Sequence, residues 1–160
     1  MPETRITPNL WFDNEAEEAA EYYCSIFENS RVVNVMRYPE VSDKAGTVLV
    51  VEFELDGTRF VGINGGPQFK FSEAVSLQID CETQEEVDCY WDKLTDGGEE
   101  SQCGWLKDRY GLSWQVTPTG IDELFSDPDK DKANRAWEAM MKMRKLDVAE
   151  LHRAADGVAA

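Results

Sequence analysis

Apolar positions at the start of the chain follow first a strand pattern and then a helix pattern. Residues 6–12 alternate apolar with polar or smaller side chains, which predicts a short, half-buried strand. Over residues 16–27 the apolar positions recur at helical spacing, behind a capping-box pattern of Asn14 and Glu17. Three further strands, the last two joined by an Asp-Gly hairpin signal, are predicted at residues 31–38, 47–55 and 58–64.

The same order of elements begins again after Gly65-Gly66-Pro67, which interrupts regular structure. A strand is predicted at residues 74–80 and a helix at residues 83–96, where Thr83 and Glu86 form a second capping box. The buried stripe of this helix is predicted at Val87, Tyr90, Trp91 and Leu94. Shorter strand segments, ended by Pro118, are predicted at residues 99–103, 105–108 and 112–117.

A shift of 67 residues places the second half of the chain on the first. Identical residues then coincide at Leu10 and Leu77, Asp13 and Asp80, Glu15 and Glu82, Glu18 and Glu85, and Tyr23 and Tyr90. Together with the repeated order of strand, helix and three strands, this favours an internal duplication. The predicted fold class is therefore α+β, with two tandem β-α-β-β-β units at residues 5–66 and 73–118 within one domain of residues 1–118.

Residues 119–160 are interpreted as a helical C-terminal extension of this domain. A short helix is predicted at residues 121–125, a longer one that starts at Asp127 or Asp129, and a last turn or two at residues 148–155. The longer helix has an apolar face at i, i+3, i+4 spacing, formed by Ala133, Ala136, Trp137, Met140 and Met141. We expect this face to pack on the domain or on a partner subunit.

The chain is strongly acidic, with 32 Asp and Glu residues against 16 Lys and Arg and a formal net charge of −16. Such a charge repels nucleic acid and anionic membrane surfaces, because affinity for both comes mainly from clustered Lys and Arg. Neither is expected as a partner. No stretch approaches the roughly 20 apolar residues of a membrane helix, and the first residues lack an export-signal pattern, so we expect a soluble cytoplasmic protein.

Few residues are suited to metal or nucleophilic chemistry. The single histidine, His152, lies in the extension, which removes most histidine-based catalysis and most zinc sites. The four cysteines, which form no Cys-x-x-Cys pair and are expected to be reduced, are Cys24, Cys81, Cys89 and Cys103. Only Lys107 and Arg109 are near enough in sequence to activate the Cys103 thiol, so we expect it to be structural.

Several sequence strings carry a resemblance to a known family. They are Ile-Thr-Pro-Asn-Leu-Trp-Phe at residues 6–12, Asn-Gly-Gly-Pro at 64–67, Cys-Gly-Trp-Leu-Lys-Asp-Arg-Tyr-Gly at 103–111, and Ser-Trp-Gln-Val at 113–116. In the extension, matching positions are Phe125, Asp127-Pro128-Asp129, Ala136 and Met140-Met141. With the tandem units, these strings resemble the PhnB-like family of the vicinal oxygen chelate superfamily, the glyoxalases and bleomycin-resistance proteins.

The resemblance implies that the two units form a cupped mixed sheet, the glyoxalase/bleomycin resistance fold, with a site in its interior. It also implies a homodimer, in which a partner subunit completes the cavity. Metal-dependent members take His, Glu or Gln ligands from the first, fourth, fifth and eighth strands. The corresponding stretches here contain no His and no carboxylate, and only Gln115 stands where a ligand could be. One neutral amide cannot hold a divalent ion, so we expect no metal and no cofactor.

The residues expected to bind a small-molecule ligand are amides and aromatics. Asn64, Gln78 and Gln115 are the expected hydrogen-bonding groups, and Trp11 and Trp105 are the expected stacking walls, with Cys103 beside them. Strand alternation predicts that Trp114 faces away from the cavity if Gln115 faces into it. No catalytic residue is assigned.

The leading hypothesis is a metal-free small-molecule binding protein or degenerate enzyme of this superfamily. A metal-dependent glyoxalase-like lyase or dioxygenase is the alternative, and a purely structural protein with a self-filled cavity is the third. The family's older label, 3-demethylubiquinone-9 3-methyltransferase, implies methyl transfer. That activity is disfavoured, because the chain has no Gly-rich strand-to-helix loop for the methyl donor.

Overall fold

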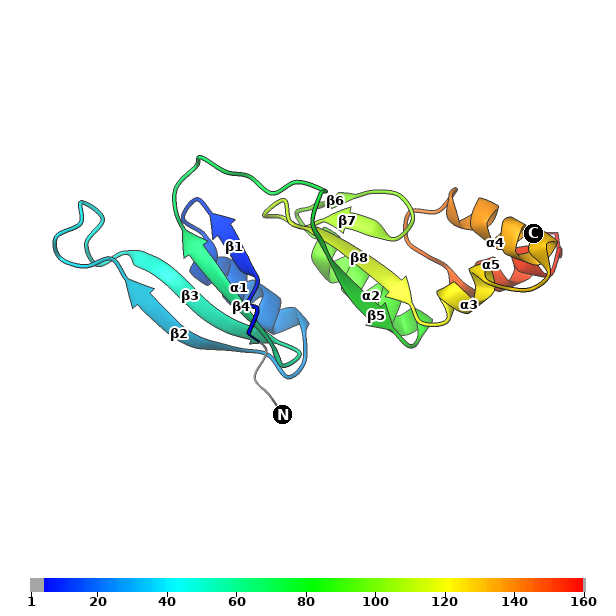
Figure 1. The fold of residues 1–160 in the computed structure, drawn as a ribbon, viewed down its shortest axis with the longest axis horizontal. Coiled ribbons are helices and arrows are strands. Elements are labelled where there is room, and N and C mark those ends of the chain that lie inside the picture. Colours follow the sequence, from blue (N-terminus) through cyan, green and yellow to red (C-terminus); the bar gives the residue numbers. More distant parts are fainter. Residues whose placement is uncertain (1–4, 160) are drawn as a thin grey trace. The chain divides into compact units, whose positions relative to one another are not determined.

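The structure is a computed structural model that describes residues 5–159 (Figure 1). It contains two β-sheets, each with a helix against one face, and a helical segment that follows the second sheet. The chain divides into two units between Phe71 and Ser72. The first unit contains β1 (Asn9–Phe12), α1 (Ala16–Ile26), β2 (Arg31–Arg37), β3 (Val48–Leu55) and β4 (Thr58–Asn64). Its strand order is β1-β4-β3-β2, with β1 parallel to β4 and the other neighbours antiparallel.

The second unit has the same topology, in the order β5-β8-β7-β6. Its elements are β5 (Ser76–Cys81), α2 (Gln84–Thr95), β6 (Glu99–Glu100), β7 (Trp105–Lys107) and β8 (Ser113–Pro118), followed by α3 (Ile121–Phe125), α4 (Lys130–Met140) and α5 (Val148–Ala155). The predicted α+β class, the two β-α-β-β-β units and the helical extension are confirmed. Within residues 5–159, no helix is both long and apolar enough to cross a membrane.

Two strands, β1 and β6, are three residues shorter than predicted. β1 begins only at Asn9, although alternation suggested a strand from residue 6. Pro8 has no amide hydrogen for the strand ladder, and only its carbonyl is used, by the Val61 amide at 3.0 Å. β6 has two residues where five were expected over residues 99–103, because the chain turns before Trp105, whose carbonyl accepts from the Ser101 amide.

The core of the first unit lies between α1 and one face of the sheet. Val51, Phe53 and Leu55 of β3 are buried, and the residues between them are partly exposed, which is the alternation expected of a strand with one covered face. The helix contributes small side chains that allow a close approach. A Cβ atom on Gly62 of β4 would lie 3.1 Å from that of Ala16.

The start of α1 is capped differently from the prediction. The expected capping box of Asn14 and Glu17 is wrong, because Glu15 occupies the N-cap and makes no side-chain cap bond. The Ala16 amide instead donates to Oδ1 of Asn64, 48 positions later, over 2.9 Å. The Asn64 Nδ2 atom donates to a carbonyl of β3 at 3.1 Å. One buried amide therefore satisfies backbone groups of a helix and of a strand.

The buried faces of the two covering helices confirm the repeat but not its predicted shift. Ala19, Tyr23 and Ile26 of α1 are buried, and the buried residues of α2 lie 68 positions later in each case. They are Val87, Trp91 and Leu94. Tyr90, which was predicted in the buried stripe, is only half-buried. The structural correspondence of the helices is thus one residue away from the sequence alignment.

A buried aspartate closes the turn between β7 and β8. Asp108 is 3% exposed, and its Oδ1 atom accepts hydrogen bonds from the amides of Tyr110 and Leu112 at 2.9 and 3.1 Å. Its Oδ2 atom accepts from Nε1 of Trp114 at 2.9 Å. These charge-assisted bonds tie the turn to the first half of β8.

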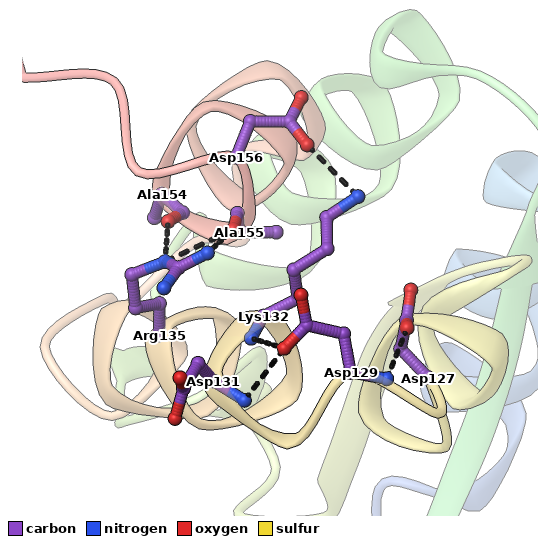
Figure 2. Close-up of polar contacts among 8 residues, drawn as sticks. All are labelled: Asp127, Asp129, Asp131, Lys132, Arg135, Ala154, Ala155 and Asp156. Carbon is purple, nitrogen blue, oxygen red and sulfur yellow. Dashed lines mark hydrogen bonds and ion pairs between the residues drawn. The ribbon is translucent and has the colours of Figure 1, made fainter.

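Polar contacts between α4 and the end of α5 hold the extension together (Figure 2). Arg135 donates through Nε and Nη2 to the carbonyl of Ala155 at 3.0 and 2.6 Å, and through Nε to that of Ala154 at 3.2 Å. Lys132 pairs with Asp156 at 3.0 Å. Carbonyls at a helix C-terminus lack partners within the helix and carry partial negative charge, so two cations stabilise the end of α5 here.

Of the two residues considered for the start of the long extension helix, Asp129 is the N-cap of α4. Its Oδ1 atom accepts from the amides of Asp131 and Lys132 at 3.0 and 3.3 Å (Figure 2). Asp127 lies one step earlier and accepts from the Asp129 amide at 2.8 Å. Asp127 therefore stabilises the loop before α4, and Asp129 caps the first turn of the helix.

The segment between α4 and α5 is anchored to α2. Gln84 donates through Nε2 to the Leu146 carbonyl at 3.0 Å and accepts from the Val148 amide at 2.9 Å. One turn further along α2, Lys145 hydrogen-bonds to Asp88 and holds the pKa of that carboxyl below its usual value. The extension is therefore attached to the second unit by paired polar contacts as well as by apolar packing.

We predict that Asp108→Ala lowers the free energy of unfolding by about 3 kcal/mol, because buried N–H groups lose a charged acceptor. Asp96→Ala is the control, since Asp96 is an exposed partner of Arg109 in a surface ion pair and its loss should cost no more than about 1 kcal/mol. Chemical denaturation of both variants measures the difference. Equal destabilisation would contradict the role of Asp108.

We also predict that Gln84→Ala loosens the extension locally. Amide hydrogen exchange at Val148 should become roughly five- to tenfold faster, because its acceptor is lost. Glu85→Ala, a change at an exposed neighbour on the same helix, should leave this exchange rate unchanged. Unaltered protection of Val148 in the Gln84 variant would show that the anchor lies elsewhere.

Candidate functional site

A cavity of about 590 Å³ lies in the second unit, between its sheet and the helices α3 and α4. β5, β7 and β8 supply one side, the cavity floor, through Gln78, Trp105 and Gln115. The extension supplies the other side, the helical wall, through Phe125, Trp137 and Met141. The site is therefore built by two parts of the chain that the sequence analysis treated separately.

Strand pairing brings the three floor residues into one row. Gln115 of β8 is the register partner of Gln78 on β5 and of Trp105 on β7. Partners directly opposite each other share a face of the sheet. Trp114 and Val116, the neighbours of Gln115 along β8, are buried. The prediction that Trp114 and Gln115 face opposite ways agrees with this arrangement.

The two floor amides are oriented by hydrogen bonds to their own sheet. Gln115 Nε2 donates to the Ser76 hydroxyl at 2.8 Å, and Gln78 Nε2 donates to Oδ1 of Asp80 at 2.7 Å. Each bond uses one amide hydrogen and fixes which way the amide points. Within the described chain, a second hydrogen and a carbonyl oxygen of each amide can still serve a ligand in the cavity.

The helical wall is apolar and incompletely covered. Phe125 and Trp137 meet edge to face, with ring centroids 5.4 Å apart. Trp137 of α4 and Met141 at its C-cap are 52% and 50% exposed, although both belong to the apolar face that the sequence predicts for this helix. Met140, their neighbour on that helix, is buried in a cluster with Leu146 and Leu151 within the extension. The wall thus offers aromatic and thioether surface to whatever enters the cavity.

Cys103 lies at the edge of the cavity and is half-buried. Its Sγ atom lies 3.7 Å from Sδ of Met141, which links the floor side to the helical wall. The Cys103 backbone has a positive φ of 59°, and its amide donates to the Met143 carbonyl at 2.9 Å. The Cys103 backbone thus bonds to the extension, which fits the structural role expected from the sequence. Its side chain also lines the cavity.

The two remaining expected ligand residues, Asn64 and Trp11, belong to the first unit and do not line this cavity. The Asn64 amide makes the buried helix and strand bonds described above. Trp11 donates through Nε1 to the Gly66 carbonyl at 2.9 Å and meets Phe69 edge to face. A Cβ atom on Gly65 would lie only 2.1 Å from the Trp11 ring, so this close packing requires glycine.

The lining contains residues that sequence reasoning did not assign to a site. Phe125, Trp137 and Met141 were noted as family positions or as a packing face, and Asp122 and Glu123 were not singled out at all. Helical periodicity marks an apolar face without telling whether it meets protein or a cavity. The sequence signal was therefore limited to the apolar stripe itself, which includes Trp137 and Met141.

The side chains are poor candidates for a divalent metal centre. Within residues 5–159, no group of three or more His, Cys, Asp or Glu side chains is placed to hold an ion. In the cavity floor the row across the sheet consists of two neutral amides and an indole. Amide oxygens alone are weak ligands for divalent transition-metal ions.

Comparison with known proteins identifies the relatives of this chain. The family model described as 3-demethylubiquinone-9 3-methyltransferase matches residues 4–117. The solved PhnB protein from Bacillus cereus is 38% identical, with a TM-score of 0.67, over 72% of this chain and 100% of its own. No curated protein matches in sequence.

More distant solved structures show the fold alone. Protein PA1353 from Pseudomonas aeruginosa is 17% identical with a TM-score of 0.62, over 72% of this chain and 98% of its own. The fosfomycin resistance protein FosX from Mesorhizobium loti is 11% identical with a TM-score of 0.56, over 79% and 99%. The glyoxalase/bleomycin resistance fold is thereby confirmed. The family match ends before α3, so the helical wall lies outside it, although Phe125 and Met141 resemble family positions in the sequence.

We predict an order of reactivity among the four free cysteines. Burial raises the pKa of the Cys81 thiol to about 12 and also raises that of Cys24, so both carry little reactive thiolate at neutral pH. Exposed Cys89 should react first with iodoacetamide, Cys103 next, Cys24 later, and Cys81 only after unfolding. Peptide mapping over time gives the order. A Cys103 thiol as slow as Cys81 would contradict its access to the cavity.

Proposed function

The chain belongs to the 3-demethylubiquinone-9 3-methyltransferase family, whose PhnB-like members it resembles, and from this membership we propose that it binds a small organic molecule without a metal ion. The cavity of the second unit is the proposed site. The two floor amides orient the polar end of the ligand, and Trp105 with the helical wall covers its flat or apolar body. Any turnover would make the protein a degenerate enzyme of the superfamily.

One observation carries this proposal: four of the six residues expected from sequence to bind a ligand line one cavity. They are Gln78, Cys103, Trp105 and Gln115. The volume of about 590 Å³ is in the range of ordinary small-molecule sites, roughly 300–1,000 Å³. An apolar lining with a few oriented polar groups is also typical of such sites. A self-filled structural core would not leave Trp137 half exposed beside the floor.

Metal-dependent chemistry and methyl transfer are both less well supported. A lyase or dioxygenase of this superfamily needs converging anionic or imidazole ligands, whereas the floor offers amides. Methyl transfer from a nucleotide-like donor needs a Gly-rich loop that opens a helix after a strand. Gly65-Gly66-Pro67 follows β4, but residues 65–75 lead directly to β5.

The proposal includes a homodimer. β2 is the outer strand of the first sheet, and it exposes Val33 and Met36 to 48% and 49%. An uncovered strand with apolar side chains favours association with a second copy. Size-exclusion chromatography with light scattering measures the subunit number, and a monomer at micromolar concentration would contradict this part of the proposal.

We expect gently purified protein to carry an organic ligand and no stoichiometric divalent ion in native mass spectrometry. As a defined probe, naphthylmethanol combines a flat apolar ring with one hydroxyl group. Its affinity, measured by titration calorimetry, should fall about tenfold in Gln115→Leu, which removes an oriented polar group. Gln102→Leu changes an exposed glutamine outside the lining and should bind as the unaltered protein does. A stoichiometric divalent ion, or equal affinity of both variants, would overturn the proposal.

A further inference from the structure

The charged groups around the cavity are all of one sign. Three acidic side chains line it, namely Asp80 at the end of β5 and Asp122 and Glu123 on α3. Among the described residues of the lining, none is Lys or Arg. We propose that the cavity selects an organic cation with a flat apolar body, an inference that rests on the proposed binding function and names its ligand class.

The positions of the carboxylates suit recognition at the cavity rim. Asp80, Asp122 and Glu123 are exposed, whereas Gln115, Trp105 and Phe125 of the same lining are partly buried. An exposed carboxylate keeps its own hydration until the ligand arrives, so it adds attraction without a large desolvation cost. Asp80 is held toward the floor by the hydrogen bond from Gln78. A cationic group at the rim would therefore meet a carboxylate while its apolar body enters the cavity.

The aromatic side chains strengthen the same preference. Trp105, Phe125 and Trp137 all contribute to the lining. The faces of aromatic rings attract cations, and tryptophan does so most strongly. Trp137 is half exposed, so its ring can meet a ligand at the mouth of the cavity. An anion would gain nothing from these faces.

The dipole of α3 and the net charge of the chain also act on a ligand. Neither changes the preference for a cation. The N-terminal end of α3 contributes at most about half a positive charge, which is less than the two carboxylates in its first turn. The net charge of the whole chain, −16, attracts cations and repels anions at long range. The local lining and the overall field therefore act in the same direction.

The selectivity comes mainly from the extension. Asp122, Glu123, Phe125 and Trp137 all follow residue 117, where the family match ends. The cavity floor is the part that this chain shares with its family, and it is neutral except for Asp80. The ligand class is therefore a property that this chain can have without its shorter relatives sharing it.

Three probes with one ring system test the inference: naphthylmethylammonium, naphthylmethanol and naphthoate. Calorimetry at low ionic strength should give the cation an affinity at least about tenfold above that of the alcohol, and the carboxylate the weakest affinity. The preference for the cation should shrink as salt is added, because rim charges are screened. An alcohol that binds as tightly as the cation, or a carboxylate that binds most tightly, would overturn the inference.

A pair of double variants separates the rim from the overall charge. Asp122→Asn with Glu123→Gln should reduce the preference for the cation about fivefold or more and leave the affinity for the alcohol unchanged. Glu21→Gln with Glu28→Gln makes the same change in net charge at exposed residues of the first unit and should leave the preference intact. Equal effects of the two double variants would refute selection at the rim.

The outcomes distinguish this inference from the function on which it rests. If the alcohol binds and Gln115→Leu weakens it, the proposed binding function holds whatever the charge preference. Loss of the charge preference in that case refutes only the selection of cations. If none of the three probes binds to the unaltered protein, both the binding function and the ligand class are refuted.

Discussion

The carboxylate of Asp108 sets the geometry on which the candidate site depends. It ties the turn after β7 to the first residues of β8 and to the Trp114 indole. This fixes the register of the hairpin, and with it the pairing of Gln115 with Trp105. A slip of one residue would exchange the two faces of β8, sending Gln115 into the core and Trp114 into the cavity. Asp108 therefore does not line the cavity, but it determines which side chains of β8 form the cavity floor.

The strands β6 and β7 of the second unit are short, and the extension supplies hydrogen-bond acceptors for backbone amides beside them. β2 and β3 have seven and eight residues, whereas β6 and β7 have two and three. A short edge leaves backbone amides without strand partners. The Cys103 and Gly104 amides donate instead to the Met143 and Arg144 carbonyls of the extension. A Cβ on Gly104 would lie 2.9 Å from the Val116 carbonyl oxygen of β8 and 3.0 Å from Cδ1 of Leu146 in the extension, so only glycine fits between them.

Local patterns predicted most of the fold, and the errors fall where distant residues act. Strands and helices were located correctly because alternation and helical spacing are properties of neighbouring residues. The cap of α1 was missed, because its acceptor is Asn64, on another strand. In the site, alternation predicted the orientation of Gln115 relative to Trp114. The helical wall was not predicted, because no local pattern tells that α4 would face the floor rather than a partner.

The family match ends near residue 117, and most of the groups proposed to select a ligand lie after that position. The shared part provides the sheet that carries Gln78, Trp105 and Gln115, a row of neutral groups that could orient many molecules. Discrimination between molecules needs groups whose interaction differs strongly from one ligand to another, and charges differ most. Here two of the three charged groups, Asp122 and Glu123, lie on α3, beyond the family match, and the third, Asp80, lies on β5 within it. Family membership therefore accounts for the fold and the sheet that forms the cavity floor, and under the proposed function the extension would select the ligand.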